Sequence, residues 1–220
     1  MIIENKNIYL YGKENSGTPL VIVNTFEGDG KEIYDTIKNL TDKAFTMTVI
    51  ADIDWNDEMA PWECPAMFKG DIPCTGGADK YLKKLEEIFI PKIIDEIGTE
   101  PEYIAIAGYS LGGLFAIYSL YKTAIFKRAV SASGSMWFPK FADFIMKNEM
   151  KSPVEKVYFS LGDKEAAVKN QVLKTVEENT RKIYEHFRSK NIETVFEMNP
   201  GNHFKDADLR LAKGIAYILE

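Results

Sequence analysis

Stretches of continuous apolar residues alternate along the chain with stretches in which apolar residues recur every three or four positions. The first pattern predicts strands that are buried on both faces, and the second predicts helices that pack on one face. The predicted strands span residues 7–12, 18–26, 45–54, 103–108, 126–134, 156–162 and 193–199. The predicted helices span residues 30–42, 78–98, 111–123, 167–190 and 204–219.

Two of the predicted helices have features that the structure can test. Helix 78–98 contains Pro91, and proline lacks the N–H that a helical hydrogen bond needs, so we expect a bend near this residue. Helix 167–190 has an apolar stripe that we expect to face the core. The stripe consists of Val168, Val172, Val176, Ile183 and Phe187.

Residues 55–77 match neither pattern and contain three prolines and both cysteines. Irregular connections of this length are usually functional or disordered.

Strands that alternate with helices predict an α/β fold, in which a mostly parallel sheet is covered by helices on both faces. The chain has 220 residues, 45% of them hydrophobic and 27% charged, which fits one domain spanning residues 1–220. In such sheets ligands bind at the carboxyl ends of the strands. A functional site should therefore lie among the residues that directly follow each strand.

Charge and cysteine content narrow the classes of partner. The net charge is −6 and no block of Lys or Arg occurs, so we expect neither nucleic acid nor an anionic membrane as a partner. No stretch approaches 18 apolar residues and no signal-peptide pattern is seen, so we expect no membrane span. Cys64 and Cys74 could pair, but we expect free thiols, a cytoplasmic location and no zinc site.

The segment GYSLGG, residues 108–113, directly follows a predicted buried strand and opens a predicted helix. Gly-x-Ser-x-Gly in this strand–turn–helix setting predicts a nucleophile elbow, with Ser110 as the nucleophile. The turn is sharp, and a side chain at Gly108 or Gly112 would crowd the neighbouring strand and helix. The alternative is that Ser110 only caps the helix.

A serine nucleophile needs a base, and the chain has two histidines. His186 lies beside Phe187 in a predicted helix, where a structural role is expected. His203 directly follows the last predicted strand, in a loop at the carboxyl edge of the sheet, and is therefore the candidate base. The alternative for His203 is a loop residue that makes an N-cap-like contact.

The acid of a catalytic triad lies between the serine and the histidine in the sequence of this fold. Asp163 and Glu165 directly follow the strand at 156–162 and are both candidates. Either carboxylate could instead be a residue at a helix N-terminus, where the helix dipole favours negative charge. Position favours Glu165, because it lies further along the loop toward His203 and has the longer side chain.

Four segments together resemble the "Putative esterase" family, which includes esterase D-type, feruloyl-esterase-like and siderophore-esterase-like enzymes. They are GYSLGGLFAIYSL, SASGSMWFP, SLGDKEAAVKN and NPGNHFKDADLRLAKGIAYIL. The resemblance implies an α/β-hydrolase fold without a separate lid domain, with Ser110 as nucleophile and His203 as base. It also implies Glu165, the third residue after the strand-end glycine, as the acid, with Asp163 as the alternative.

This chemistry predicts hydrolysis of a small-molecule carboxylic ester through an acyl-enzyme. Backbone N–H groups of Leu111 and Phe26 should form the oxyanion hole. We expect no metal and no organic cofactor.

Aromatic and methionine side chains near the strand ends suggest a flat or apolar substrate group, unless these side chains only roof the core. The candidate substrate-binding residues are Tyr109, Trp137, Met136, Trp55 and Trp62, with Met59 near them. Two competing hypotheses keep the fold: an acyltransferase, and a non-catalytic binding protein.

Overall fold

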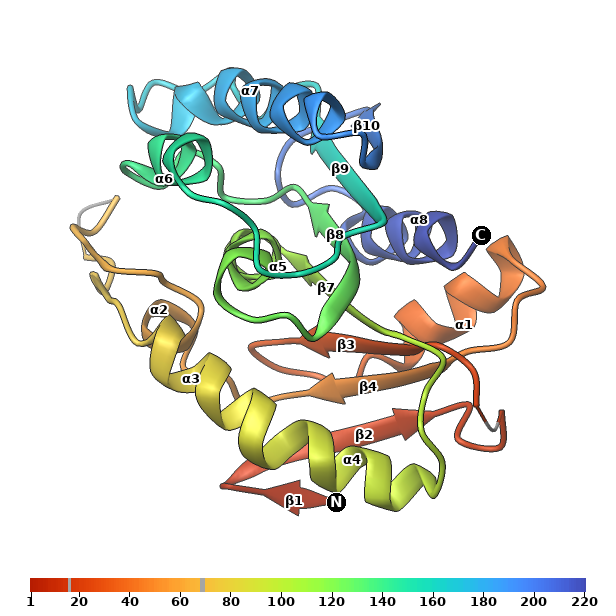
Figure 1. Ribbon diagram of the computed structural model, residues 1–220. Coiled ribbons are helices and arrows are strands. Elements are labelled where there is room, and N and C mark those ends of the chain that lie inside the picture. The colour runs from red at the N-terminus through yellow and green to blue at the C-terminus, as the bar shows by residue number, and fades with distance from the viewer. Residues whose placement is uncertain (16, 68–69) are drawn as a thin grey trace.

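A computed structural model describes residues 1–15, 17–67 and 70–220. Eight strands form its central sheet in the order β1-β2-β4-β3-β7-β8-β9-β10 (Figure 1). From β4 to β10 all neighbours are parallel, and β1 and β2 join one edge in antiparallel pairing. The strands are β1 (Ile2–Ile3), β2 (Lys6–Tyr11), β3 (Leu20–Asn24), β4 (Thr46–Ile50), β7 (Ile104–Tyr109), β8 (Phe126–Ala132), β9 (Lys156–Gly162) and β10 (Glu193–Asn199).

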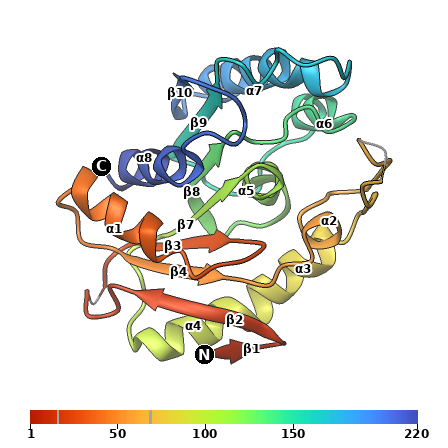
Figure 2. The ribbon, with the colours of Figure 1, turned by 180° about the vertical axis from the view of Figure 1, so that it is seen from behind.

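Helices cover both faces of this sheet, which confirms the predicted α/β fold (Figures 1 and 2). Helices α1 and α8 pack on one face, and α3, α4, α5, α6 and α7 pack on the other. The helices are α1 (Lys31–Leu40), α2 (Trp55–Glu58), α3 (Ala78–Lys84), α4 (Ile90–Ile97), α5 (Leu111–Lys122), α6 (Phe141–Lys147), α7 (Val176–Ser189) and α8 (Ala207–Leu219). Within the described ranges, no helix is long and apolar enough to cross a membrane.

Strand β3 shows why the central strands appear as unbroken apolar runs. Leu20 and Ile22 belong to the core on one face of the sheet, and Val21 and Val23 belong to the core on the other face. All four side chains are at most 1% exposed. Because successive residues of a strand point to opposite faces, burial of both faces requires apolar residues at every position.

The predicted helix 167–190 is wrong over its first nine residues. Helix α7 begins at Val176, after a short 3₁₀ turn at Leu173–Thr175, and Val168 and Val172 are each 39% exposed. The Asn170 side-chain oxygen accepts hydrogen bonds from the backbone N–H groups of Val172 and Leu173. Such a local side-chain bond offers the backbone an alternative to the helix.

The sequence predicted a bend near Pro91, and the structure has a π-helical turn, Leu85–Phe89, just before this residue, joining α3 to α4. Proline cannot donate a hydrogen bond to the carbonyl four residues earlier, and a π turn accommodates that loss.

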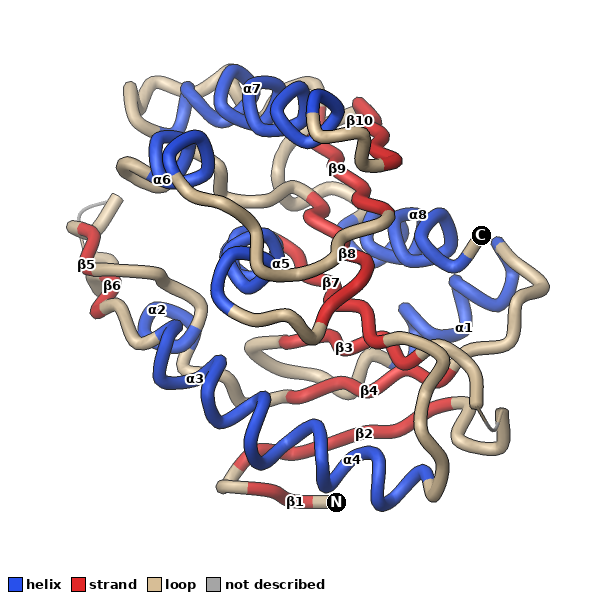
Figure 3. The backbone as a smooth tube through the Cα atoms, viewed as in Figure 1, coloured by secondary structure: helices blue, strands red, loops and turns tan. Residues whose placement is uncertain are grey.

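Residues 55–77 contain more structure than the sequence predicted (Figure 3). Helix α2 opens the segment, and the short strands β5 (Glu63–Cys64) and β6 (Cys74–Thr75) pair antiparallel within it. Cys64 lies opposite Cys74 in this pairing, and both thiols are free, as predicted. Helix α6 and strand β1 were also not predicted.

Candidate active site

The turn between β7 and α5 has the backbone geometry of a nucleophile elbow. Ser110 lies in it with φ 57° and ψ −123°, a conformation that costs a non-glycine residue about 1–3 kcal/mol. Glycine is required two residues before Ser110, since a Cβ on Gly108 would collide with the carbonyl group of Gly112. A Cβ on Gly113 would lie 3.0 Å from the Ser131 hydroxyl. The local sequence therefore positions Ser110 at the carboxyl end of β7.

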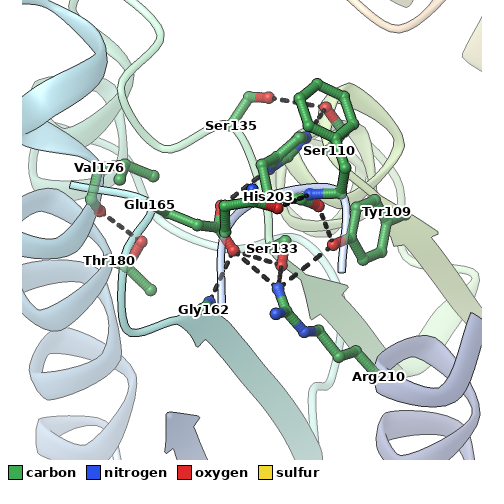
Figure 4. A network of polar contacts seen from close by, with 12 residues as sticks. Tyr109, Ser110, Ser133, Ser135, Gly162, Glu165, Val176, Thr180, His203 and Arg210 are labelled. Carbon is green, nitrogen blue, oxygen red and sulfur yellow. Dashed lines mark hydrogen bonds and ion pairs between the residues drawn. The ribbon is translucent and has the colours of Figure 1, made fainter. Parts of the chain in front are cut away.

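His203 and Glu165 lie next to Ser110 in a hydrogen-bonded chain (Figure 4). His203 Nε2 is 3.1 Å from Ser110 Oγ, and His203 Nδ1 is 2.8 Å from Glu165 Oε2. His203 comes from the loop between β10 and α8, and Glu165 follows β9. The fold thus brings together three residues that are separated by up to 93 positions in sequence.

The Glu165 carboxylate is almost fully buried, and its second oxygen is also occupied. Oε1 accepts hydrogen bonds from the Gly162 N–H at 2.6 Å, the Ser133 hydroxyl at 2.7 Å and Arg210 Nη1 at 3.1 Å. Burial raises the pKa of Glu165, but the hydrogen bonds from His203, Gly162 and Ser133 outweigh it and lower the pKa below its ordinary value. Glu165 is therefore ionised at neutral pH.

Asp163, the alternative acid, makes a different contact. Its Oδ1 accepts a hydrogen bond from the Gly201 N–H at 2.7 Å. This bond ties the loop after β9 to the histidine loop, and the carboxylate beside His203 is that of Glu165.

The second histidine, His186, lies on α7 and is half-buried. Burial and then the nearby Lys190 lower the pKa of His186. It does not line either of the cavities beside Ser110.

Two cavities meet at Ser110. The larger, of about 680 Å³, is lined by residues of the segments 55–67 and 70–77 and also by Phe26 and Leu111. The smaller, of about 320 Å³, lies on the His203 side and has mostly apolar walls. Those walls include Val168, Leu173, Val176 and Phe204. Val168 and Phe204, which are 39% and 87% exposed, are thus part of the lining of a cavity.

Trp137 lines both cavities and Trp55 lines the larger one, while the other predicted pocket residues lie elsewhere. Met136 is fully buried, as is Met59. For these two residues the alternative interpretation, a roof over the core, is the one that the structure supports.

Trp62 packs in an aromatic cluster away from Ser110. Its ring contacts those of Tyr118, Phe138 and Phe144, and its indole N–H donates to the Pro139 carbonyl at 2.9 Å. These contacts account for a tryptophan at position 62 without any contact to a substrate.

Tyr109 also does not line either cavity. Its hydroxyl donates to the backbone carbonyl of His203 at 2.5 Å and so holds the histidine loop. A residue next to Ser110 in sequence thus holds the loop that carries His203.

Both predicted oxyanion-hole residues line the larger cavity together with Ser110. Leu111 is the first residue of α5, where a backbone N–H has no partner within the helix. Phe26 lies in the turn after β3 and is 60% exposed.

Sequence reasoning missed Ser133, Ser135 and Arg210. Ser135 Oγ lies 3.4 Å from Ser110 Oγ, and Ser133 contacts Glu165. Arg210 offered a signal, because it shares the buried face of α8 with Gly214 and Ile218. A charged residue at a core position usually has a buried partner. Within the described ranges, no group of three or more His, Cys, Asp or Glu side chains is arranged to hold a metal ion.

Comparison with solved structures shows the same fold. An IroE-like serine hydrolase from Shewanella oneidensis superimposes with a TM-score of 0.74 at 17% identity, over 96% of this chain and 74% of that one. The siderophore hydrolase EstA from Aspergillus nidulans superimposes with a TM-score of 0.67 at 19% identity, over 93% of this chain and 83% of that one. The predicted α/β-hydrolase fold is thereby confirmed.

Sequence comparison gives the family. The uncharacterized protein YbbA of Bacillus subtilis (strain 168) is 24% identical over 191 residues, which are 82% of this chain and 75% of YbbA. The family described as "Putative esterase" matches residues 11–208. Since that match spans most of the sequence, the chain belongs to this family of esterases and serine hydrolases.

Proposed function

We propose that this protein hydrolyses carboxylic esters of small molecules, with Ser110 as the nucleophile, His203 as the general base and Glu165 as the acid. One observation carries the proposal: the chain of hydrogen bonds from Ser110 through His203 to Glu165, with Ser110 in the strained turn after β7. Nucleophile, base and orienting carboxylate within hydrogen-bond reach are the signature of covalent catalysis.

In the first step, Ser110 Oγ attacks the ester carbonyl carbon while His203 Nε2 takes the hydroxyl proton. The carbonyl oxygen becomes an oxyanion, which the N–H groups of Leu111 and Phe26 stabilise. The bond to the alcohol oxygen then breaks, and His203 gives its proton to that oxygen. Glu165 keeps the imidazole in the required tautomer and stabilises its charged form without taking the proton.

In the second step, water attacks the carbonyl carbon of the acyl-enzyme while His203 takes one of its protons. The bond between that carbon and Ser110 Oγ breaks, and His203 returns the proton to Oγ. The carboxylic acid leaves and the free enzyme is restored. Every bond formed and broken in the two steps uses only ester, water and these side chains.

We infer where the two halves of the ester bind from the positions of the two cavities. Because His203 must protonate the leaving oxygen, the alcohol group lies on the His203 side, in the cavity of about 320 Å³. The acyl group then extends on the other side of Ser110, into the cavity of about 680 Å³. Apolar walls in the smaller cavity favour a compact apolar or aromatic alcohol. The siderophore hydrolase among the structural neighbours supports a small-molecule ester as substrate.

A fluorophosphonate probe with mass-spectrometric mapping tests the nucleophile directly, with Ser110→Ala as the matched control. We expect one label per chain, on Ser110, and hydrolysis of short acyl and aryl esters. Folded protein that is not labelled would point to a binding protein instead. Preferential transfer of the acyl group to an added alcohol, rather than to water, would identify an acyltransferase.

A further inference from the structure

Arg210 is a buried cation beside the proposed active site. It lies in the first turn of α8, and its side chain is only 1% exposed. Removing a charge from water is costly unless the charge is paired and hydrogen-bonded, so the contacts of this guanidinium indicate its role.

The guanidinium contacts four segments around the site at once (Figure 4). Nη1 lies 3.1 Å from Glu165 Oε1, 3.1 Å from the Ser133 hydroxyl and 3.4 Å from the Tyr109 hydroxyl. Nη2 donates to the Pro200 carbonyl at 3.1 Å, three residues before the base. One side chain from α8 therefore links the ends of β7, β8 and β9 to the histidine loop.

The end of β9 leaves room for this side chain. A Cβ on Gly162 would collide with the Gly201 carbonyl oxygen and lie 2.9 Å from both Nη1 and Nη2 of Arg210, and all three distances are closer than real Cβ contacts. The same glycine donates its N–H to Glu165 Oε1. Glycine at this position thus accommodates the guanidinium and binds the carboxylate that the guanidinium contacts.

We propose that Arg210 is a positioning residue that fixes Glu165 and offsets its charge, an inference that rests on the proposed triad. Arg210 and the two other donors occupy Oε1, so the carboxylate cannot rotate and Oε2 stays directed at His203 Nδ1. The cation also offsets the carboxylate charge, so that the imidazole of His203 faces a smaller net negative charge.

The charged and titratable groups around Glu165 and His203 come from several elements. Two of these groups are Arg210 of α8 and Tyr109 of β7. The others are Asp163, in the loop after β9, and Lys205, in the loop between β10 and α8, and both lie against Gly201. None of these groups changes in the variants below except Arg210.

The test compares Arg210→Met and Arg210→Lys with the wild type, and it uses Arg128→Met as a matched control. Arg128 is the other arginine that reaches α8: it contacts the Ile218 carbonyl and stacks on Tyr103, away from the site. For each protein, the rate of fluorophosphonate labelling at Ser110 is measured from pH 5 to 9. The ring signal of His203 is followed by NMR in parallel, which is practical because the chain has two histidines.

Arg210→Met should label about 10- to 100-fold more slowly at neutral pH, a smaller loss than the roughly 10⁴-fold loss seen when the acid of such a triad is replaced. The pH at which the labelling rate is half-maximal should rise by at least about 0.5 pH unit, since the carboxylate charge is no longer offset. The midpoint of the His203 NMR titration should rise by a similar amount. Arg210→Lys keeps the charge and should restore the midpoint but not the rate, because an ammonium cannot bridge Glu165 and Pro200. Arg128→Met should lower the Tm with the rate and midpoint unchanged.

A folded Arg210→Met protein with the wild-type midpoint would overturn the proposal. If this variant does not fold, Glu165→Gln is compared with Glu165→Gln/Arg210→Met, which leaves no buried charge unpaired. The added change should then alter the labelling rate by less than about threefold, since no carboxylate remains to be positioned. A further loss of about tenfold or more would show that Arg210 acts independently of Glu165. A wild type that is not labelled would contradict the proposed function itself, and the NMR titration would still test Arg210.

Discussion

Two regions of the molecule meet at Ser110, and they are built differently. On the His203 side, hydrogen bonds join side chains and loops that lie up to 101 positions apart in sequence. On the other side, residues 55–67 and 70–77 form a wall that includes a four-residue helix and two strands of two residues each. The first region fixes the geometry of a few polar atoms, and the second gives the cavity its size and apolar surface.

The difference predicts how each region responds to substitution. In the hydrogen-bonded region one missing atom leaves a buried partner unsatisfied and disturbs the whole chain of contacts. In the wall, a substitution removes apolar contact area, at about 25 cal/mol per Å², and its effect scales with the size of the substrate. Large effects should therefore be confined to the first region.

The largest effect is expected for Ser110→Ala. Ester hydrolysis should fall by at least about 10⁴-fold, because the atom that attacks the ester is gone. The Tm should not fall, since the change removes a hydroxyl from a strained residue that faces a cavity. Steady-state kinetics and thermal unfolding measure the two outcomes. A loss of only severalfold would remove Ser110 from the role of nucleophile.

The next effect separates the two carboxylates. Glu165→Gln should lower kcat by about 10²- to 10⁴-fold, because the amide cannot stabilise the imidazolium or hold the required tautomer. Asp163→Asn keeps an oxygen that can accept from the Gly201 N–H, so its effect on kcat should be below about fivefold. Measuring kcat of both variants with the same ester shows which carboxylate acts in catalysis. If neither change matters by tenfold, Ser110 and His203 work as a dyad.

A smaller effect is expected at the boundary of the two regions. Trp137→Ala should reduce kcat/KM by about tenfold for bulky aromatic esters and by about twofold for acetyl esters, since the indole lines both cavities. Trp62→Ala is the control: it should lower the Tm through the loss of its aromatic contacts but leave the ratio between the two esters unchanged. Equal losses for both esters in Trp137→Ala would assign Trp137 a structural role.

The smallest effect is expected at the two cysteines of the wall. Burial, and then the neighbouring Cys64, raise the pKa of Cys74 to about 11. Because the thiolate is the reactive form, alkylation of Cys74 by iodoacetamide at pH 7.5 should be about 100-fold slower than that of free cysteine, and it should speed up as the pH rises. Cys74→Ser should change kcat/KM by less than about threefold. Rapid alkylation at neutral pH would show that the wall opens in solution.

Part of this site follows from short stretches of sequence. Strands buried on both faces must be apolar at every position, so the runs around Val21 and Ile106 could be recognised directly. The turn at Ser110 excludes a side chain at Gly108, and the glycines at positions 108, 112 and 113 are its signature in the sequence. His203 could be located because it directly follows a strand.

The tertiary structure decided the rest. The sequence favoured Glu165 over Asp163 by position but left both open, since both follow the same strand and their partners come from a loop 38 residues away. It could not show that Trp62 and Met136 face the core while Trp137 faces the cavities, because side-chain direction in a loop depends on what packs against it. Arg210 is the clearest case: its residue type indicates a surface position, and only the assembled ends of β7, β8 and β9 supply the carboxylate, hydroxyls and carbonyl that make its burial favourable.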